Sequence, residues 1–370
     1  MKIPKYFLTA CLVFAAADAA QEPEYPFNLD VELLWMQRNR SPDQDLVNWG
    51  SPFCYCECGV NNYSTTMLID DLDRTLGFRI TGNIRNKDKG TMELRGTTPF
   101  DFSSVKNIYS PAQTNAACDL SYGYIHVDQD ASPYVPIFDT VEVVETVPVV
   151  INGVTVYETI DYYNTDYIEA DRAKIEYDSS YFTLESNYWL HLSPRWKDYF
   201  SVSFGFGLRY FSFLEGIKGT FYKSQNSILA NSSNVSTFSA DTKNHLYGAQ
   251  VLLDLHIHPY SWFDWGIRMD GGAFAAHQRL INQVNDLNGS VLLSKYTKQT
   301  IDYAFFGDLE IFAAVKILGR GYGLFSYGGT LIHGVAQATS NLNLTTKQFP
   351  IDDQGNILFQ WWSLGLGLDF

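Results

Sequence analysis

Apolar and polar residues alternate at every second position through much of this chain. In the clearest segment, six apolar residues alternate with Ser, Gly and Arg: Phe200, Val202, Phe204, Phe206, Leu208 and Tyr210. A period of two is that of a β-strand with two different faces. Ten segments show this pattern, near residues 27–35, 76–84, 92–100, 182–192, 200–210, 247–257, 263–269, 301–317, 325–335 and 362–370.

The connections between these segments alternate in length. Short turns lie near residues 85–90, 193–198, 259–261 and 318–321, and long polar connections span 39–66, 102–172, 224–242, 285–299 and 340–355. An even number of strands with short turns on one side and long loops on the other is typical of outer-membrane barrels. We therefore predict an all-β fold, a transmembrane antiparallel β-barrel of ten strands with long extracellular loops, over residues 20–370.

The second long connection holds a hairpin signal. Asn152-Gly153 lies between the β-branched runs 147–151 and 154–157, and Asn-Gly in that setting favours a tight hairpin turn. If this hairpin joins the wall, the barrel has twelve strands. The acidic stretch 119–171 around it is either a surface ligand or Ca²⁺-binding loop, or only a solvated surface.

The first residues indicate a secreted protein. Lys2 and Lys5 precede the apolar run 7–17, and Ala17-Asp18-Ala19 fits a cleavage site, so we predict a signal peptide over residues 1–19. No later run of 18 apolar residues follows, so a closed barrel is the remaining way to span a membrane. The 25 Phe, 24 Tyr and 27 Gly also favour β-structure. The formal net charge of −15 argues against nucleic acid and anionic lipid as partners.

The last predicted strand resembles the closing strand of bacterial outer-membrane barrels, whose final aromatic residue is recognised by the barrel-insertion machinery. Its apolar face holds Trp362, Leu364, Leu366, Leu368 and Phe370. This resemblance implies a bacterial outer-membrane location, with outer-membrane lipid and the insertion machinery as partners.

Two further segments, Leu184–Glu215 and Leu253–Gly272, resemble planctomycete- and chlamydia-type outer-membrane β-barrel proteins. Each contains an acid, a strand, a Pro turn and then a Gly-x-Arg motif. The resemblance extends over most of residues 170–370 and the strands near 75–100, although hairpin barrels converge on such motifs. It implies an outer-membrane, porin-like role and no catalytic residues.

The polar face of the predicted strands collects charge. Candidate lumen residues are Arg79, Arg95, Arg209, Arg268, Glu93, Glu185, Asp254, Asp270, Asp308 and Glu310, and Arg38, Glu32 and Glu215 share this face. Because acids outnumber bases there, we predict a porin that lets small hydrophilic solutes or ions diffuse passively, with a mild cation preference.

The alternative is a closed lumen. A barrel of about ten strands is narrow, and charges buried in it must be paired. The protein would then be a structural or adhesin-like surface protein. Continuous pairing of Arg79, Arg95, Arg209 and Arg268 with the acids would favour this closed form.

Four cysteines fall in the first two long connections: Cys54, Cys56, Cys58 and Cys118. In an oxidising compartment such residues predict disulfides. Residues two apart on a strand have Cα atoms near the upper limit for bridging, so at least one of the first three is expected to pair with Cys118. The others would pair within a tight turn or between molecules. The resemblance to chlamydial envelopes suggests disulfide-linked envelope proteins or a homo-oligomer.

Two other chemistries are weaker alternatives. Asp254, His256 and His258 share one strand face, but no carboxylate or Cys stands beside them at the spacing of a known metal site. We therefore predict no metal and no cofactor. Asp70, Asp71 and Asp73 are similar to the acidic pairs that omptin-type barrel proteases, also ten-stranded, use with a His. A second His–Asp constellation is not evident at an external position, so we predict that the protein is not an enzyme.

Overall fold

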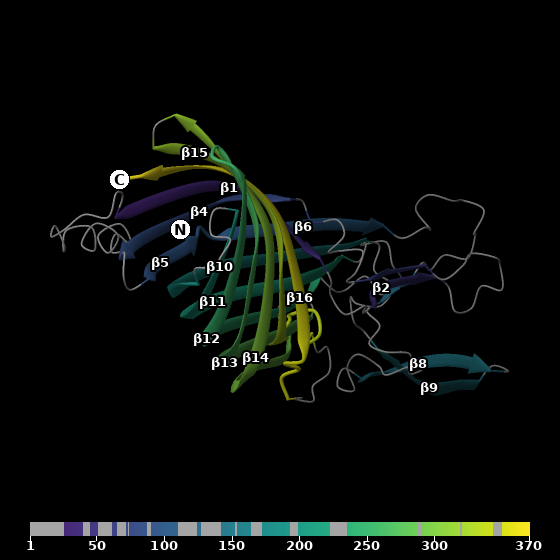
Figure 1. Ribbon diagram of the computed structural model, residues 1–370. Coiled ribbons are helices and arrows are strands. Elements are labelled where there is room, and N and C mark those ends of the chain that lie inside the picture. The colour runs from purple at the N-terminus through teal and green to yellow at the C-terminus, as the bar shows by residue number, and fades with distance from the viewer. Residues whose placement is uncertain are drawn as a thin grey trace.

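A closed antiparallel barrel forms the body of the protein. The computed structural model describes residues 26–39, 45–50, 61–64, 72, 74–86, 90–109, 124–126, 142–151, 154–163, 172–192, 199–222, 235–286, 291–318, 320–342 and 350–370. The strands of its wall are β1 (Phe27–Asn39), β4 (Thr75–Asn86), β5 (Gly90–Thr97), β6 (Phe100–Tyr109), β10 (Arg172–Leu192), β11 (Phe200–Tyr222), β12 (Val235–Tyr260), β13 (Phe263–Asp286), β14 (Val291–Leu318), β15 (Gly321–Val335) and β16 (Gly355–Asp369) (Figure 1).

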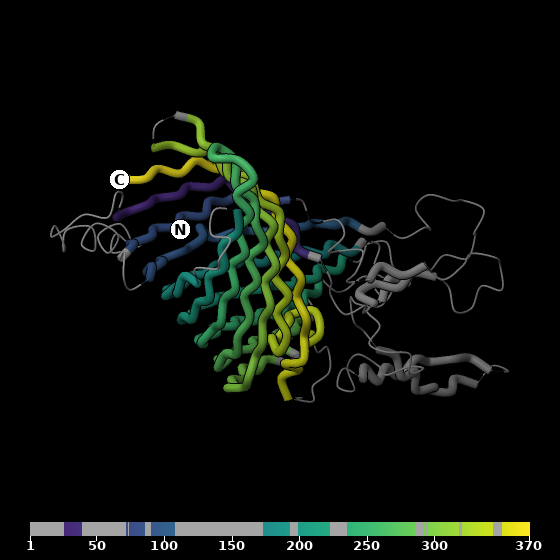
Figure 2. Tube along the Cα trace, in the orientation of Figure 1, coloured from purple at the N-terminus to yellow at the C-terminus, as the bar shows by residue number. Residues whose placement is uncertain are grey.

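Each wall strand pairs with its neighbours until the ring closes, with β16 against β1 and β10 against β11. β5 and β6 pair with the same strand, β10, one at Leu184–Trp189 and the other at Arg172–Tyr181. Eleven strands therefore fill ten positions in the wall, and the predicted ten-stranded antiparallel barrel is confirmed. Figure 2 follows these strands around the wall.

Two small sheets lie apart from the wall in the pairing order. One contains β2 (Asp45–Gly50), β3 (Asn61–Ser64) and β7 (Tyr124–His126), and the other is the hairpin of β8 (Glu142–Ile151) and β9 (Val154–Tyr163). The Asn-Gly signal therefore predicted the hairpin correctly. Because β8 and β9 pair only with each other in the described chain, the twelve-stranded alternative is wrong.

The described strand ends beside the short turns share one rim of the barrel with the start of β1 and the end of β16. Backbone bonds run along it from Arg85 N to Pro26 O (2.8 Å), from Lys316 N to Trp262 O (2.9 Å) and from Phe370 N to Phe27 O (2.8 Å). In the outer-membrane topology this rim faces the periplasm, and it is called the inner rim below. The opposite end is called the outer end.

The strands from β10 to β14 are longer than a membrane requires. They contain 21 to 28 residues, whereas about 9–11 tilted residues cross the hydrocarbon. The predicted loops 224–242 and 285–299 are wrong in this respect, because β12 begins at Val235 and only residues 287–290 separate β13 from β14. β6 likewise extends to Tyr109 inside the predicted loop 102–172.

The outer face carries an apolar belt near the inner rim. Exposed side chains there include Phe78, Phe204, Leu208, Tyr303 and Leu309. All five apolar residues of the predicted assembly signal, four on β16 and Phe370 directly after it, are also 45–65% exposed. Their alternation with buried neighbours is that of a wall whose outer surface contacts lipid. Among the described residues, no helix is long and apolar enough to cross a bilayer.

Candidate functional site in the barrel lumen

The lumen is organised in levels from the inner rim to the outer end. At the inner rim lies a cavity of about 450 Å³, which we call the vestibule. Its charged lining includes Asp30, Asp254, Asp264, Arg85 and Lys316, and Arg85 and Lys316 are exposed at its mouth. The vestibule is large enough for several water molecules. It is bounded on its deep side by Arg79, Arg95 and Glu310.

The histidines that line the vestibule, His191 and His256, and the neighbouring His258 all have polar partners. His256 Nε2 lies 3.1 Å from Asp254 Oδ2, and His258 Nδ1 lies 2.8 Å from Asp264 Oδ1. His191 bonds through its two ring nitrogens to Thr91 (2.7 Å) and Ser203 (2.8 Å). Within the described ranges, no group of three or more His, Cys, Asp or Glu is arranged to hold a metal.

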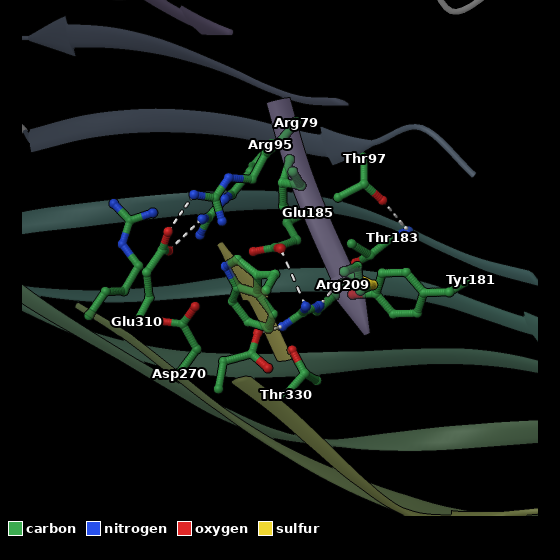
Figure 3. Close-up of a pocket in the computed structure, with 15 residues that line it drawn as sticks. Arg79, Arg95, Thr97, Tyr181, Thr183, Glu185, Arg209, Asp270, Glu310 and Thr330 are labelled. Carbon is green, nitrogen blue, oxygen red and sulfur yellow. Dashed lines mark hydrogen bonds and ion pairs between the residues drawn. The ribbon is translucent and has the colours of Figure 1, made fainter. Parts of the chain in front are cut away.

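Ion pairs cross the lumen above the vestibule. Glu310 on β14 accepts hydrogen bonds from Arg79 on β4 and, at 2.6 Å, from Arg95 on β5 (Figure 3). Arg79 also donates to both carboxylate oxygens of Glu32 on β1, at 2.7 and 2.6 Å. These side chains are 6–8% exposed, and charges at such depth require close partners.

A second set of ion pairs completes this level. Arg209 on β11 contacts Asp308 on β14 at 2.5 Å and Glu185 on β10 at 3.6 Å. Arg268 on β13 bridges Glu93 on β5 and Asp254 on β12, each at 3.3 Å. All four candidate arginines are therefore paired with acids, in the pattern that the sequence analysis named as favouring a closed barrel.

A cavity of about 30 Å³ remains among these ion pairs (Figure 3). Asp270 on β13 faces it directly opposite Asp308 in the strand register. Five buried polar atoms that line it have no hydrogen-bond partner: Arg268 Nε, Asp270 Oδ1, Asp308 Oδ1, Thr330 Oγ1 and Trp361 Nε1. This volume fits water and is too small for a solute.

Aromatic side chains fill the lumen above the ion pairs. Phe359 on β16 contacts Tyr181 on β10 (ring centroids 4.6 Å apart), Phe102 on β6 (6.1 Å) and Phe213 on β11 (6.2 Å). The rings therefore meet across the barrel. A continuous cluster of buried apolar residues reaches this level from every wall position except that of β4. There Gly77 leaves room for the Phe100 ring.

The chain after β15 turns into this core. Residues 336–342, which we call the inner segment, are almost entirely buried. Asn244 on β12 donates to Ala336 O (2.8 Å) and accepts from Ala336 N (2.9 Å). Gln278 on β13 donates to Gly334 O just before it (2.9 Å), and Glu215 accepts from Ala338 N (2.5 Å). Inward side chains of β11 to β13 thus hold this segment inside the barrel. The predicted loop 340–355 consequently begins within the lumen rather than outside it.

A fully buried ion pair lies beside the inner segment. Arg38 on β1 is 2.8 Å from Glu215 on β11, and neither side chain is exposed. The Arg38 guanidinium lies over the rings of Tyr177 (5.3 Å) and Phe213 (5.1 Å). Tyr177 donates a hydrogen bond of 2.6 Å to the same carboxylate. This pair ties opposite walls together where the aromatic core is deepest.

The sequence missed the apolar filling of the lumen. Leu34 and Met36 on β1, and Phe211 and Phe213 on β11, are apolar and face inward, on the side of each strand that was expected to be polar. The signal was present as a change of pattern after Arg209, where the inward positions become mostly apolar while outward positions such as Ser212 and Lys218 are polar. The signal peptide 1–19, the residues Asp70, Asp71 and Asp73, and the cysteines Cys54, Cys56, Cys58 and Cys118 lie outside the described residues.

Comparisons with known proteins give overall likeness only. The sequence matches no protein-family model, and no curated protein is significantly similar to it. The outer membrane protease OmpT from Escherichia coli aligns with a TM-score of 0.44 and 9% identity, over 96% of this chain and 99% of that one. The toluene transporter TodX from Pseudomonas putida aligns at 0.23 and 6%, over 94% and 90%. The transport unit of the autotransporter AIDA-I from Escherichia coli aligns at 0.25 and 6%, over 99% and 97%.

Structural similarity with TM-scores this low does not indicate a function. The fold follows from the strand pairing, the closed ring and the apolar outer belt. The protein is a transmembrane β-barrel of the bacterial outer membrane. The finer resemblance to planctomycete- and chlamydia-type barrels stays a prediction.

Proposed function

We propose that this protein is a closed-lumen outer-membrane barrel with a structural and surface-interaction role. The observation that carries the proposal is the contact of Phe359 with rings from β6, β10 and β11, directly above ion pairs that also cross the lumen. A diffusion pore needs a continuous aqueous path. Here the path from the vestibule ends at a cavity of about 30 Å³.

The predicted porin with mild cation preference is the second candidate. The vestibule of about 450 Å³ favours it, because charged side chains line this cavity from the inner rim to the middle of the barrel. Passage would require the inner segment to leave its contacts with Asn244 and Glu215 and the Arg209–Asp308 pair to separate. Gated conduction is therefore the form in which this function would exist.

Conductance in a planar bilayer with a KCl gradient separates the two functions. The refolded protein lacking residues 1–19 is expected to give no channel openings. Insertion is verified by heat-modifiable migration on a gel, and a general diffusion porin in the same lipid serves as the positive control. Regular openings of the inserted protein, with a reversal potential that favours cations, would overturn the closed-lumen proposal.

The surface role includes the predicted cross-linking by cysteine. Cys54, Cys56, Cys58 and Cys118 would link external loops within one molecule or between envelope proteins. Alkylation of intact cells before and after reduction tests this role, and we expect these thiols to react only after reduction. Equal labelling without reductant would leave the barrel as a surface protein without cross-links.

We assign no catalytic residue, and the omptin-like alternative depends on Asp70, Asp71 and Asp73, which the structure does not describe.

A further inference from the structure

Basic side chains are placed directly opposite one another on the outer wall. In the register of β12 and β13, Lys243 pairs with Arg279, and the next pair on the same face is His245 with His277. All four residues face outward, since their chain neighbours point into the buried lumen. Like charges in directly opposed positions destabilise a sheet. Packing of the wall therefore gives no reason for this arrangement, which we call the basic cluster.

Acidic side chains of the wall offset the charge of the basic cluster only in part, because Asp241 attracts Lys243 without forming a close ion pair. Within the described residues, neither Lys243 nor Arg279 forms an ion pair, and Arg279 Nε is buried without a hydrogen-bond partner. Asp241 is the nearest acid along β12, but its Oδ1 lies 3.1 Å from the position that a Cβ would take at Gly216 on β11. The Asp241 carboxylate thus leans toward β11, away from Arg279. Two permanent positive charges remain available on the outer face.

The cluster lies at the outer edge of the apolar belt. One step toward the inner rim, Tyr247, Ala275 and Tyr303 are aligned across β12, β13 and β14. The two tyrosines are 59% and 76% exposed. Exposed tyrosines mark the boundary between hydrocarbon and headgroups in membrane barrels. The basic cluster is therefore at the level of the headgroups of the outer leaflet.

A shallow apolar channel runs from the cluster into the belt. The outward residues of β13 below His277 are small, Ala275, Ala273 and Gly271, and they lie beside Tyr303 and Phe305 of β14. A Cβ added at Gly307, which pairs with Gly271, would meet nothing within 4 Å, and one at Gly271 would meet only Phe306 O at 3.7 Å. The wall is thus hollowed along a line that starts at the basic cluster.

We propose that the basic cluster and this channel bind a phosphate-bearing lipid of the outer leaflet. Arg279 and Lys243 would hold the phosphate, as guanidinium and ammonium groups do at phosphate sites. One acyl chain would lie along Ala275, Ala273 and Gly271. The net charge of −15, which argued against anionic lipid, does not decide this point. Fields at the surface are screened within about 8–10 Å, so the local charges govern binding.

The test measures lipid binding to the refolded protein in neutral detergent. The probes are lipid A with two phosphates, the same lipid without phosphate, and inorganic phosphate. The Lys243→Gln/Arg279→Gln variant is compared with the control Lys174→Gln/Lys218→Gln, which removes two outward charges from β10 and β11. We expect the first variant to bind phosphorylated lipid at least about tenfold more weakly and the control to bind normally.

One further variant and one further lipid comparison test the channel and the phosphate separately. Ala273→Leu fills the channel with a lipid-facing apolar side chain and should weaken binding of lipid A without affecting heat-modifiable folding. Phosphate-free lipid should bind the native protein no better than lipid A binds the double glutamine variant. The proposal is overturned if both double variants lose affinity equally or if neither does. Inorganic phosphate binding as tightly as the lipid would also overturn it.

Discussion

Arg38 on β1 and Glu215 on β11 form an ion pair of 2.8 Å across the barrel, with both side chains fully buried. The pair lies among aromatic rings, and the same carboxylate accepts hydrogen bonds from Tyr177 and from the backbone of Ala338. Glu215 therefore connects two walls and the inner segment at a single point.

Replacing one member of this pair should be costly. Arg38→Met leaves the Glu215 carboxylate buried without its positively charged partner, and we expect a loss of about 3–5 kcal/mol in the free energy of unfolding. Urea unfolding of the refolded protein in lipid measures it. Lys174→Met is the control, because the Lys174–Glu176 pair is about one-third exposed and should cost no more than about 1 kcal/mol. Equal effects of the two substitutions would show that the buried pair has no special role.

The ring of Phe359 is expected to be a main source of stability. Phe359→Ala removes contacts with three other wall positions and leaves a cavity, at a cost of about 3–5 kcal/mol. The same unfolding assay applies, with the lipid-facing Phe204→Ala as the matched control, since Phe204 is 42% exposed. A Phe359→Ala variant as stable as Phe204→Ala would mean that the lumen is less tightly packed than the ring contacts indicate.

Gly77 should not tolerate a side chain. A Cβ there would overlap the Phe100 ring, so Gly77→Ala overpacks the lumen and should destabilise the protein by about 1–3 kcal/mol. Gly307→Ala on the outer face meets nothing within 4 Å and should change stability by no more than about 0.5 kcal/mol. If thermal unfolding of the two variants coincides, Phe100 does not occupy the space beside Gly77.

Asn244 should determine how firmly the inner segment is held. Its amide satisfies both backbone groups of Ala336, so Asn244→Ala leaves a buried N–H and a buried C=O unpaired, at about 1–3 kcal/mol each. Hydrogen exchange should then increase in residues 336–342 before the wall strands open. Ser239→Ala, on the outer face of the same strand, is the control. Unchanged exchange in Asn244→Ala would show that other contacts alone retain the segment.

Much of the barrel could be predicted because most wall strands, although not β6, show a local alternation of apolar and polar residues. On β11 the alternation from Phe200 to Tyr210 predicts the strand, the side that faces lipid and the position of the apolar belt. The same alternation places Arg209 on the inward face of β11 and Glu185 on the inward face of β10. The partner of each charge could not be predicted in this way. Glu310 meets Arg79 and Arg95 only because β14 lies across the lumen from β4 and β5.

The closed outer half of the lumen shows the limit of a parity argument. From Phe211 to Tyr222 the inward side chains other than Glu215 are apolar, while outward positions such as Ser212 and Lys218 are polar. A rule that equates apolar with outward therefore ended this strand at Tyr210, and it placed the start of β12 in the predicted loop 224–242. The basic cluster was missed for a related reason, since Lys243 and Arg279 are 36 residues apart and only the register brings them together.

The length of β10 to β14 has a consequence for what meets this cell surface first. At about 3.4 Å per residue, the 28 residues of β14 run for about 95 Å along the strand, whereas the apolar band of such barrels is about 25 Å tall. Hydrogen-bonded wall continues past the lipid, so the tips at Tyr222, Val235, Asp286 and Val291 are raised on a rigid collar. An antibody or phage directed at those tips would therefore meet protein before it meets the lipid.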